Sequence, residues 1–425
     1  MSITIDYTAM FDHVVGAGNG IIKDMIEASR SEFDEIRTGL RASQTGGEQP
    51  FWDLPFDIKT IEEIESFAFE NGNRYKNFVL LGIGGSALGP IALNDSLNHL
   101  HHNMLDDETR KGCRFFCPDN VDPDLMGALL DVIDPGETLF NVVSKSGGTA
   151  ETIAQFLIII DLLKNELGEK WRDHLVITTD SENGFLREFA DREKVRSFAI
   201  HPGVGGRFSI LTPVGLLPGA MIGIDIRSLC KGAAAMKKLC FAEKLEDNPS
   251  AMLAVLLYLA QTSLHKPIHV MFAYSNRLYY VADWFRQLWA ESLGKRHALD
   301  GSEIFTGPTP VKAVGATDQH SQVQLYVEGP ADKVVVFLGV KNFKRQVSIP
   351  HLGMKETNVE YLQGANLQEL INAERQATAY ALTKAGRPNM TIELDYIDAR
   401  HVGALLYLLE AATPVSYTHL TLPTN

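Results

Sequence analysis

The sequence predicts an α/β protein with mainly parallel sheets, and three observations support this fold class. Five short apolar runs lack the clean alternation expected of a strand with one face in water. Helical stretches separate these runs, the clearest of them over residues 149–166. A second series of apolar runs and helices begins after Pro249. Continuous apolar strands that alternate with helices are typical of a parallel sheet covered on both faces.

The elements divide the chain into an N-terminal helical segment, 1–75, and two α/β domains. In the N-terminal segment we predict polar helices and a loop at 45–56 that is rich in Gly, Pro and Trp. The first domain, 76–223, contains predicted strands at 77–83, 113–117, 138–143, 174–179 and 196–200. The second domain, 224–413, contains predicted helices at 250–263 and 277–293 and strands at 268–274, 322–327 and 333–338. The Gly- and Pro-rich stretch 202–223 would join the two domains.

Charge and composition limit the classes of function. The 425 residues include 39 Lys and Arg against 53 Asp and Glu, which gives a formal net charge of −14. Hydrophobic residues make up 45% and charged residues 22%, so a disordered chain is excluded. The acidic excess argues against nucleic acid as a partner, because phosphate backbones require clustered Lys and Arg. A small phosphorylated substrate stays compatible, because a few local dipoles and cations can hold it.

The cysteines and the apolar runs indicate a reduced, cytoplasmic protein. Cys113, Cys117, Cys230 and Cys240 fit neither a disulfide framework nor a zinc pattern, so we expect free thiols. The N-terminus has no basic region of the kind that opens a signal peptide. No apolar run approaches the roughly 20 residues needed to cross a bilayer, so no membrane segment is predicted.

A glycine-rich loop at 82–90 could approach a phosphate group. It places Gly85 and Ser86 between a predicted strand and a helix. Glycines let a backbone come close to a ligand, and the N–H groups at a helix start attract anions. A plain strand-to-helix turn would carry the same glycines, and the spacing is not that of a dinucleotide-binding loop.

A second loop strengthens this interpretation, because it places Ser144, Lys145, Ser146 and Thr149 within six residues between a strand and a helix. Three hydroxyls and a lysine at such a position form a phosphate cradle. The spacing of a nucleoside-triphosphate loop is absent. Capping of the helix by Thr149 is the alternative, but capping needs only one hydroxyl, and we therefore favour the cradle.

Three further features could carry out chemistry. Arg207 lies between two glycines and an aromatic residue, so its guanidinium could stabilise an oxyanion or bridge backbone carbonyls. Asp283, Gln287 and Glu291 share one stripe of the predicted helix 277–293, which would ordinarily be its solvent face. Glu291 lies close to the helix end, where a carboxylate in a closed cleft could serve as a general base.

His320 ends a polar loop at 315–320, and an imidazole can move protons near neutral pH. Most single histidines are surface or core residues without such a task. No group of His, Cys, Asp and Glu shows convincing ligand spacing, so no metal is predicted.

Together these motifs resemble the phosphoglucose isomerase (glucose-6-phosphate isomerase) family in its bacterial form. The resemblance runs from residue 77 to residue 413 and includes Gly-Gly-Arg-Phe-Ser, Glu-Ser-x-Gly-Lys and Thr-Asp-Gln-His in the family's order. It implies two sugar-isomerase (SIS) domains, each an α/β/α sandwich around a mainly parallel sheet. It also implies a cytoplasmic homodimer that acts in glycolysis and gluconeogenesis.

The resemblance implies a role for each motif in interconverting glucose 6-phosphate and fructose 6-phosphate through ring opening and a cis-enediol. Glu291 would move a proton between C2 and C1, and Arg207 would stabilise the enediolate. His320 would assist ring opening from the neighbouring subunit, and Gln287 would contact the sugar. Because the reaction only relocates protons, no cofactor is needed. Six residues would hold the phosphate end of the substrate: Gly85, Ser86, Ser144, Lys145, Ser146 and Thr149.

The resemblance stops before the end of the chain. Family members continue after the helix resembling 402–413 with a segment that carries another active-site lysine. Residues 414–425 contain neither Lys nor Glu and show no helical periodicity. We hypothesise that this tail is foreign and that the chain as written is impaired, with a natural variant end as the alternative.

Two other functions stay open. A pair of SIS domains can bind a sugar phosphate without catalysis, but such a protein would have no need of Glu291 or His320. An isomerase of a related sugar phosphate is the second alternative. A glutamine-dependent relative would need an N-terminal cysteine nucleophile, and residues 1–20 contain none.

Overall fold

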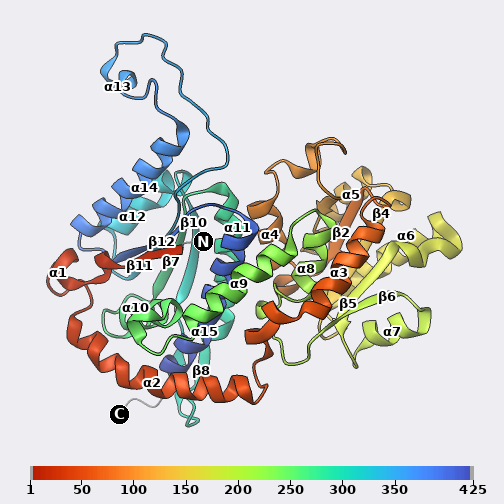
Figure 1. Cartoon of the computed structure of the whole chain (residues 1–425), viewed down its shortest axis with the longest axis horizontal. Coiled ribbons are helices and arrows are strands. Elements are labelled where there is room, and N and C mark those ends of the chain that lie inside the picture. The colour runs from red at the N-terminus through yellow and green to blue at the C-terminus, as the bar shows by residue number, and fades with distance from the viewer. Residues whose placement is uncertain (1–2, 422–425) are drawn as a thin grey trace. The chain divides into compact units, whose positions relative to one another are not determined.

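The computed structural model describes residues 3–421, which fold into two compact units (Figure 1). One comprises Ala42–Ala234, and we refer to it as the inserted unit. The other combines the chain up to Arg41 with the chain from Ala235 onward, and we refer to it as the terminal unit. Helices α2 (Lys23–Thr45) and α9 (Ile226–Cys240) cross the two boundaries. Within 3–421, none of the helices has the length and apolar character that a membrane span requires.

The inserted unit is built on a parallel sheet with the strand order β3-β2-β4-β5-β6. Its strands are β2 (Asn77–Leu81), β3 (Arg114–Phe116), β4 (Thr138–Ser144), β5 (Leu175–Asp180) and β6 (Arg196–Ile200). Every residue of β2, β4 and β5 is buried, which explains why these strands show no alternation in the sequence. The five predicted strands are confirmed, with ends shifted by no more than two residues.

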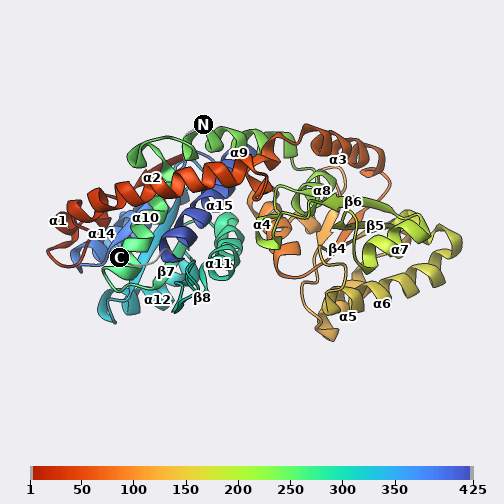
Figure 2. The same ribbon diagram turned by 90° about the horizontal axis from the view of Figure 1, so that it is seen from below.

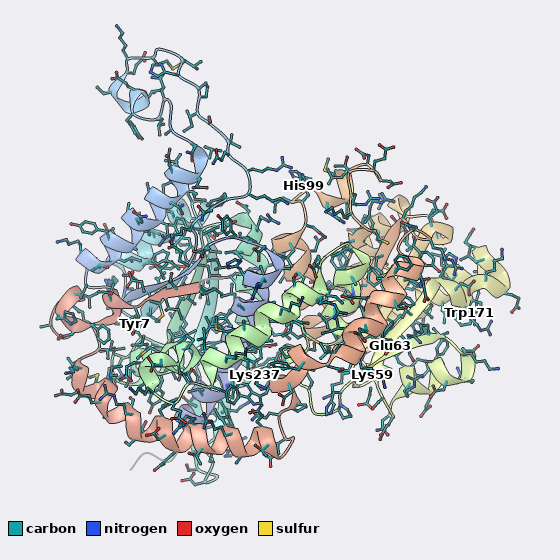
Figure 3. The ribbon with its side chains drawn as sticks, in the orientation of Figure 1. Tyr7, Lys59, Glu63, His99, Trp171 and Lys237 are labelled. Atoms are coloured by element: carbon teal, nitrogen blue, oxygen red, sulfur yellow. The ribbon has the colours of Figure 1, made fainter. Side chains whose placement is uncertain are left out.

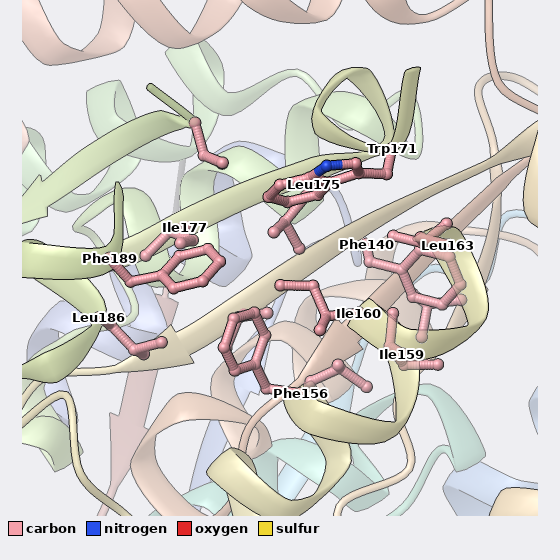
Figure 4. Packing of buried hydrophobic residues seen from close by; sticks show 14 of the residues in the cluster. Phe140, Phe156, Ile159, Ile160, Leu163, Trp171, Leu175, Ile177, Leu186 and Phe189 are labelled. Atoms are coloured by element: carbon pink, nitrogen blue, oxygen red, sulfur yellow. The ribbon is translucent and has the colours of Figure 1, made fainter. Parts of the chain in front are cut away.

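Helices cover both faces of this sheet. One face packs against α5 (Pro123–Val132), α6 (Ala150–Leu167) and α7 (Phe185–Glu193), and the other against α3 (Ile58–Asn71), α4 (Leu88–Leu97) and α8 (Pro213–Met221). Helix α6 presents Phe156, Ile159, Ile160 and Leu163 at helical spacing to the strands (Figure 4). Burial of each such side chain contributes about 1.5–3 kcal/mol, so this face is a main source of the unit's stability.

The terminal unit has a second sheet, with the order β1-β12-β11-β7-β10. Four of its strands are parallel: β7 (Ile268–Ala273), β10 (Thr309–Val314), β11 (Lys333–Val340) and β12 (Asn389–Leu394). The fifth, β1 (Ile3–Asp6), runs antiparallel to β12 and places Ile3 opposite Leu394. Strand β1 was not predicted from the sequence, because its alternation in polarity extends over only four residues at the start of the chain.

Helices also cover both faces of the second sheet (Figure 2). One face packs against α12 (Thr317–Glu328) and α14 (Leu367–Lys384), and the other against α10 (Pro249–Thr262), α11 (Tyr279–Leu293) and α15 (Ala399–Thr421). Several other elements of this unit are short: α1 (Asp12–Val15), α13 (Thr357–Glu360), and the strands β8 (Lys295–His297) and β9 (Glu303–Thr306) of a hairpin.

Both sheets have the same strand order relative to the chain. Numbered within each unit, the inserted sheet reads 2-1-3-4-5 and the parallel part of the terminal sheet reads 2-1-3-4. In such doubly wound sheets, ligands bind outside the carboxyl ends of the strands, where the connections leave the first and third strands in opposite directions. These switch points lie between β2 and β4 in one unit and between β7 and β11 in the other.

One predicted strand is wrong, because residues 322–327 belong to helix α12. The alternation of Val323, Leu325 and Val327 predicted a strand. Helical spacing instead turns Val323 and Val327 toward the core and leaves Leu325 exposed. An alternating pattern of only three apolar residues is therefore also compatible with one face of a helix.

The end of the chain also departs from expectation. Helix α15 continues through Pro414 to Thr421, although the tail has no helical periodicity in its sequence. Residues 422–425 of the predicted tail lie outside the described residues. The stretch 202–223 lies within the inserted unit, where α8 packs against α3 and α4. The predicted domain boundaries and the foreign origin of the tail stay predictions.

Candidate active site

The two loops that could hold a phosphate meet at the switch point of the inserted unit. The loop after β2 contains a short 3-10 helix, η3 (Gly84–Ser86), and the loop after β4 leads from Ser144 into α6. Strands β2 and β4 are hydrogen-bonded neighbours in a parallel register, so both loops leave the same edge of the sheet. The topology therefore brings together two motifs that lie far apart in the sequence.

Three hydroxyls of the second loop are hydrogen-bonded to one another. Ser144 Oγ lies 3.0 Å from Thr149 Oγ1 and 3.4 Å from Ser146 Oγ. Thr149 occupies the N-cap position of α6, but its side chain makes no capping hydrogen bond. The hydroxyl of Thr149 is thus turned toward Ser144, and the N-terminus of α6 lies directly beside the cluster. Such hydroxyls and a helix N-terminus can donate together to a phosphate.

Glycines allow the loops at this edge of the sheet to approach one another closely. A Cβ on Gly85 would lie 2.5 Å from the carbonyl carbon of Gly206, which begins the short 3-10 helix η7 (Gly206–Phe208). A Cβ on Gly184, whose φ is +98°, would lie 2.6 Å from the carbonyl oxygen of Ser146. Gly184 was not among the predicted site residues, although a glycine in the loop after β5, at the same sheet edge, is a signal that could have indicated it.

Lys145 connects the cradle loop to the loop that carries Arg207. Its Nζ donates to the carbonyl oxygens of Pro202, at 2.5 Å, and Val204, at 2.7 Å. The guanidinium of Arg207 lies over the ring of Phe208, 5.5 Å from the centroid. The arginine is therefore held in part by an aromatic face, a contact that neither of the two interpretations of its sequence position included.

Asp180, the last residue of β5, adds a carboxylate to this edge of the sheet. Its Oδ1 accepts from the backbone N–H groups of Glu182, at 2.9 Å, and Asn183, at 3.0 Å. These two bonds, with a contribution from the charge of Lys145, hold the pKa of Asp180 below its usual range. The ionised carboxylate thus orders the turn that leads to Gly184.

The terminal unit carries the predicted stripe on α11. Gln287 Nε2 donates to Glu291 Oε1 at 3.0 Å, and Glu291 is exposed. Asp283 is instead buried, and its carboxylate lies 2.7 Å from Lys312 Nζ and 2.7 Å from Arg286. The stripe therefore begins at a buried ion pair of Asp283 and ends at the exposed carboxylate of Glu291. The prediction that all three residues lie on the solvent face of the helix is wrong for Asp283.

His320 lies in the first turn of α12 and is exposed. The expected polar loop before a strand is thus the start of a helix. Asp318 Oδ2 accepts from the backbone N–H of Val314 at 2.7 Å, which ties the helix start to the end of β10. The neighbouring Gln319 is bound by Tyr274 and Thr378, two residues for which the sequence contains no signal.

The predicted site residues fall into two groups. Glu291 and Gln287 are hydrogen-bonded on one helix of the terminal unit, and His320 lies on another helix of that unit. The inserted unit holds the other seven in loops at one edge of its sheet: Gly85, Ser86, Ser144, Lys145, Ser146, Thr149 and Arg207.

Comparison with known sequences points to one family. The family model described as phosphoglucose isomerase matches residues 58–418. The glucose-6-phosphate isomerase of Carboxydothermus hydrogenoformans is 46% identical over 412 residues, which are 97% of this chain and 88% of that protein. A glucose-6-phosphate isomerase of Thermus thermophilus is 42% identical over 376 residues, which are 88% of this chain and 86% of that protein.

Solved structures with the same fold confirm the predicted fold class. A hypothetical protein from Thermus thermophilus superposes with a TM-score of 0.87 at 37% identity, covering 99% of this chain and 95% of that chain. A glucose-6-phosphate isomerase from Chlamydia trachomatis superposes with a TM-score of 0.75 at 24% identity, covering 86% of this chain and 69% of that chain. The second likeness concerns the fold alone.

Proposed function

The chain belongs to the phosphoglucose isomerase family, and on that premise we propose that it interconverts glucose 6-phosphate and fructose 6-phosphate in glycolysis and gluconeogenesis. The observation that carries the proposal is the cluster of Ser144, Ser146 and Thr149 at the carboxyl end of β4. These hydroxyls bond chiefly to one another, so a phosphate can replace those bonds with stronger, charge-assisted ones.

The cradle residues bind the phosphate end of the substrate. The three hydroxyls and the N-terminal N–H groups of α6 donate to its oxygens, while Lys145 supplies positive charge. Gly85 and Ser86 approach the substrate from the loop after β2, where the absence of a side chain at Gly85 lets the backbone of Gly206 pack closely against it. Local dipoles and a few cations thereby bind a dianion to a protein whose formal net charge is −14.

The chemistry proceeds in three steps. His320 assists opening of the sugar ring by moving a proton. Glu291 then takes the proton from C2 and returns it to C1, or the reverse, while Gln287 steadies the carboxylate and contacts the sugar. Arg207 stabilises the enediolate, whose negative charge exists only along the reaction path. The protein's acid and base groups only transfer protons that the substrate already carries, so the reaction consumes and releases none overall.

We further propose a cytoplasmic homodimer in which His320 acts on the substrate of the neighbouring subunit. An arm, residues 341–366, extends from the terminal unit between β11 and α14, and Figure 3 shows its side chains standing clear of the rest of that unit. Four large apolar side chains on this arm are exposed: Val347, Leu352, Met354 and Tyr361. Grouped exposed apolar residues mark contact surfaces, which supports a second chain as the partner.

The test is a coupled assay of fructose 6-phosphate conversion with wild type and Glu291→Gln. We expect the variant to lose about 1,000-fold in kcat with substrate binding kept, because removal of a general base costs about 100- to 10,000-fold. Glu328→Gln is the matched control, because Gln324 donates to Glu328 four residues along α12 as Gln287 does to Glu291 on α11. Binding without turnover in the wild type would instead indicate a sugar-phosphate sensor.

A further inference from the structure

The start of α12, which carries His320, is held by two polar side chains from outside that helix. Tyr274, directly after β7, donates its hydroxyl to the amide oxygen of Gln319 at 2.8 Å. Thr378 of α14 donates to the same oxygen at 2.9 Å. The two hydroxyl oxygens are 3.1 Å apart, so the three side chains form a closed triangle of polar contacts beside His320.

The triangle is enclosed by the core of the terminal unit. Tyr274 is fully buried and Thr378 is 5% exposed. Burial raises the pKa of the Tyr274 phenol to about 12, so the hydroxyl keeps its proton and stays a donor at neutral pH. A Cβ on Gly315 would lie 2.6 Å from atoms of the Tyr274 ring. The chain that enters α12 therefore packs directly on the tyrosine that binds Gln319.

Asp318 holds the same turn from its other side. Its Oδ2 accepts from the N–H of Val314 at 2.7 Å, and its Oδ1 accepts from Ser321 Oγ at 3.0 Å. Residues 318, 319 and 321 are thus all engaged in hydrogen bonds, whereas His320 between them is exposed. Fixed neighbours restrict the backbone of such a residue, and a functional side chain needs that kind of support.

We propose that Tyr274, Thr378 and Gln319 form a positioning group that sets the direction in which the His320 imidazole meets the sugar ring. The inference rests on the proposed function, because it takes ring opening as the task of His320. The three side chains act through the first turn of α12 and not by touching substrate. A catalytic group misplaced by about 1 Å can lose about 100-fold in rate, so loss of one supporting hydroxyl should slow ring opening about tenfold.

Exchange between the α and β anomers of glucose 6-phosphate isolates this step, because it requires ring opening and closing but no proton transfer between C1 and C2. The experiment uses the full chain with Glu291→Gln, and NMR exchange between the two anomeric proton signals measures ring opening. Adding Tyr274→Phe or Thr378→Val should slow catalysed exchange about tenfold, with substrate affinity unchanged within about twofold. Adding Thr378→Ser, which keeps the hydroxyl, should restore the exchange rate.

Tyr326→Phe is the matched control. Tyr326 is also buried on α12, and its hydroxyl bonds to Gln322 in place of Gln319. This change should leave anomer exchange within about twofold of the Glu291→Gln parent, because it leaves the first turn untouched. Equal slowing by Tyr274→Phe and Tyr326→Phe would refute the positioning role, as would a Tyr274→Phe protein that is less stable but exchanges anomers at the parent rate.

A second measurement, with Glu291 intact, reports the same step through turnover. Deuterium at C2 of glucose 6-phosphate slows proton transfer but not ring opening. Tyr274→Phe should therefore reduce this isotope effect on kcat, since ring opening then limits the rate, and an unchanged isotope effect contradicts the proposal. Binding without turnover in the wild type would instead overturn the proposed function, so the two failures are distinguishable.

Discussion

The two sheets share one strand order, but the loops at their switch points use hydroxyl groups differently. After β4 of the inserted unit, Ser144 and Thr149 bond to each other beside the start of α6. After β7 of the terminal unit, the hydroxyl of Ser275 accepts from the N–H of Arg277 at 3.3 Å and so caps its own backbone. The neighbouring Tyr274 binds a side chain of α12.

The contrast indicates that topology determines where a site can form, whereas the hydrogen-bond partners of the polar groups determine what the site does. Hydroxyls that bond to one another can exchange those bonds for a ligand. Hydroxyls that already form hydrogen bonds with backbone N–H groups or with side chains of a helix stabilise the fold and are not available to a ligand. In the inserted unit the hydroxyls at this edge bond to one another, and in the terminal unit Ser275 and Tyr274 hold the chain before α11 and the start of α12.

The largest expected effect concerns which chain supplies His320. Glu291→Gln and His320→Ala homodimers should each be nearly inactive. When the two are mixed and allowed to exchange subunits, one site of each heterodimer would combine an intact Glu291 with the partner's intact histidine. Half of the dimers would then hold one active site of two, so the assay should recover about a quarter of wild-type activity. Mixed samples that stay inactive although native mass spectrometry shows heterodimers would place His320 in its own chain's site.

The next effect separates binding from support at the two switch points. Thr149→Val should raise KM about 10- to 100-fold with a smaller change in kcat, because a hydrogen bond to a charged group contributes about 1.5–3 kcal/mol. Ser275→Ala is the counterpart in the terminal unit and should leave KM unchanged while lowering stability by about 1 kcal/mol. Steady-state kinetics measure KM and thermal unfolding measures stability for both variants. Equal changes in KM would show that the two switch points do not differ in their part in substrate binding.

The smallest effect concerns charge in the core of the terminal unit. Glu410 on α15 is fully buried, and desolvation raises the pKa of its carboxyl well above the usual value. The folded state therefore binds a proton that the unfolded state releases above pH 4.5, so this group's contribution to stability falls as pH rises from there toward the raised pKa.

Glu410→Gln, which stays neutral, should accordingly increase the free energy of unfolding at pH 7 by on the order of 1 kcal/mol and have little effect at pH 4. Denaturant unfolding at both pH values measures the change. Glu166→Gln, at an exposed position on α6, serves as the control. An equal effect of Glu410→Gln at both pH values would show that ionisation is not the cause.

The sequence predicted those parts of the molecule whose signals are local. Fully buried strands such as β4 and β5 appear as uninterrupted apolar runs, and the cradle residues lie within a single loop. Helix α12 was misread because three alternating apolar residues fit two periodicities. The sequence could not predict the hydrogen-bonded group of Tyr274, Gln319 and Thr378. These residues are 45, 59 and 104 residues apart, so they form no pattern within a short stretch of sequence.

Isomerisation in D₂O shows directly whether Glu291 moves a proton between C2 and C1 of a hexose 6-phosphate. A carboxyl group that carries the proton between the two carbons exchanges part of it with solvent. Proton NMR should therefore show deuterium entering C2 of glucose 6-phosphate and C1 of fructose 6-phosphate with the wild type. With Glu291→Gln we expect bound substrate and no deuterium at either carbon, and incorporation at the wild-type rate would show that Glu291 is not the base.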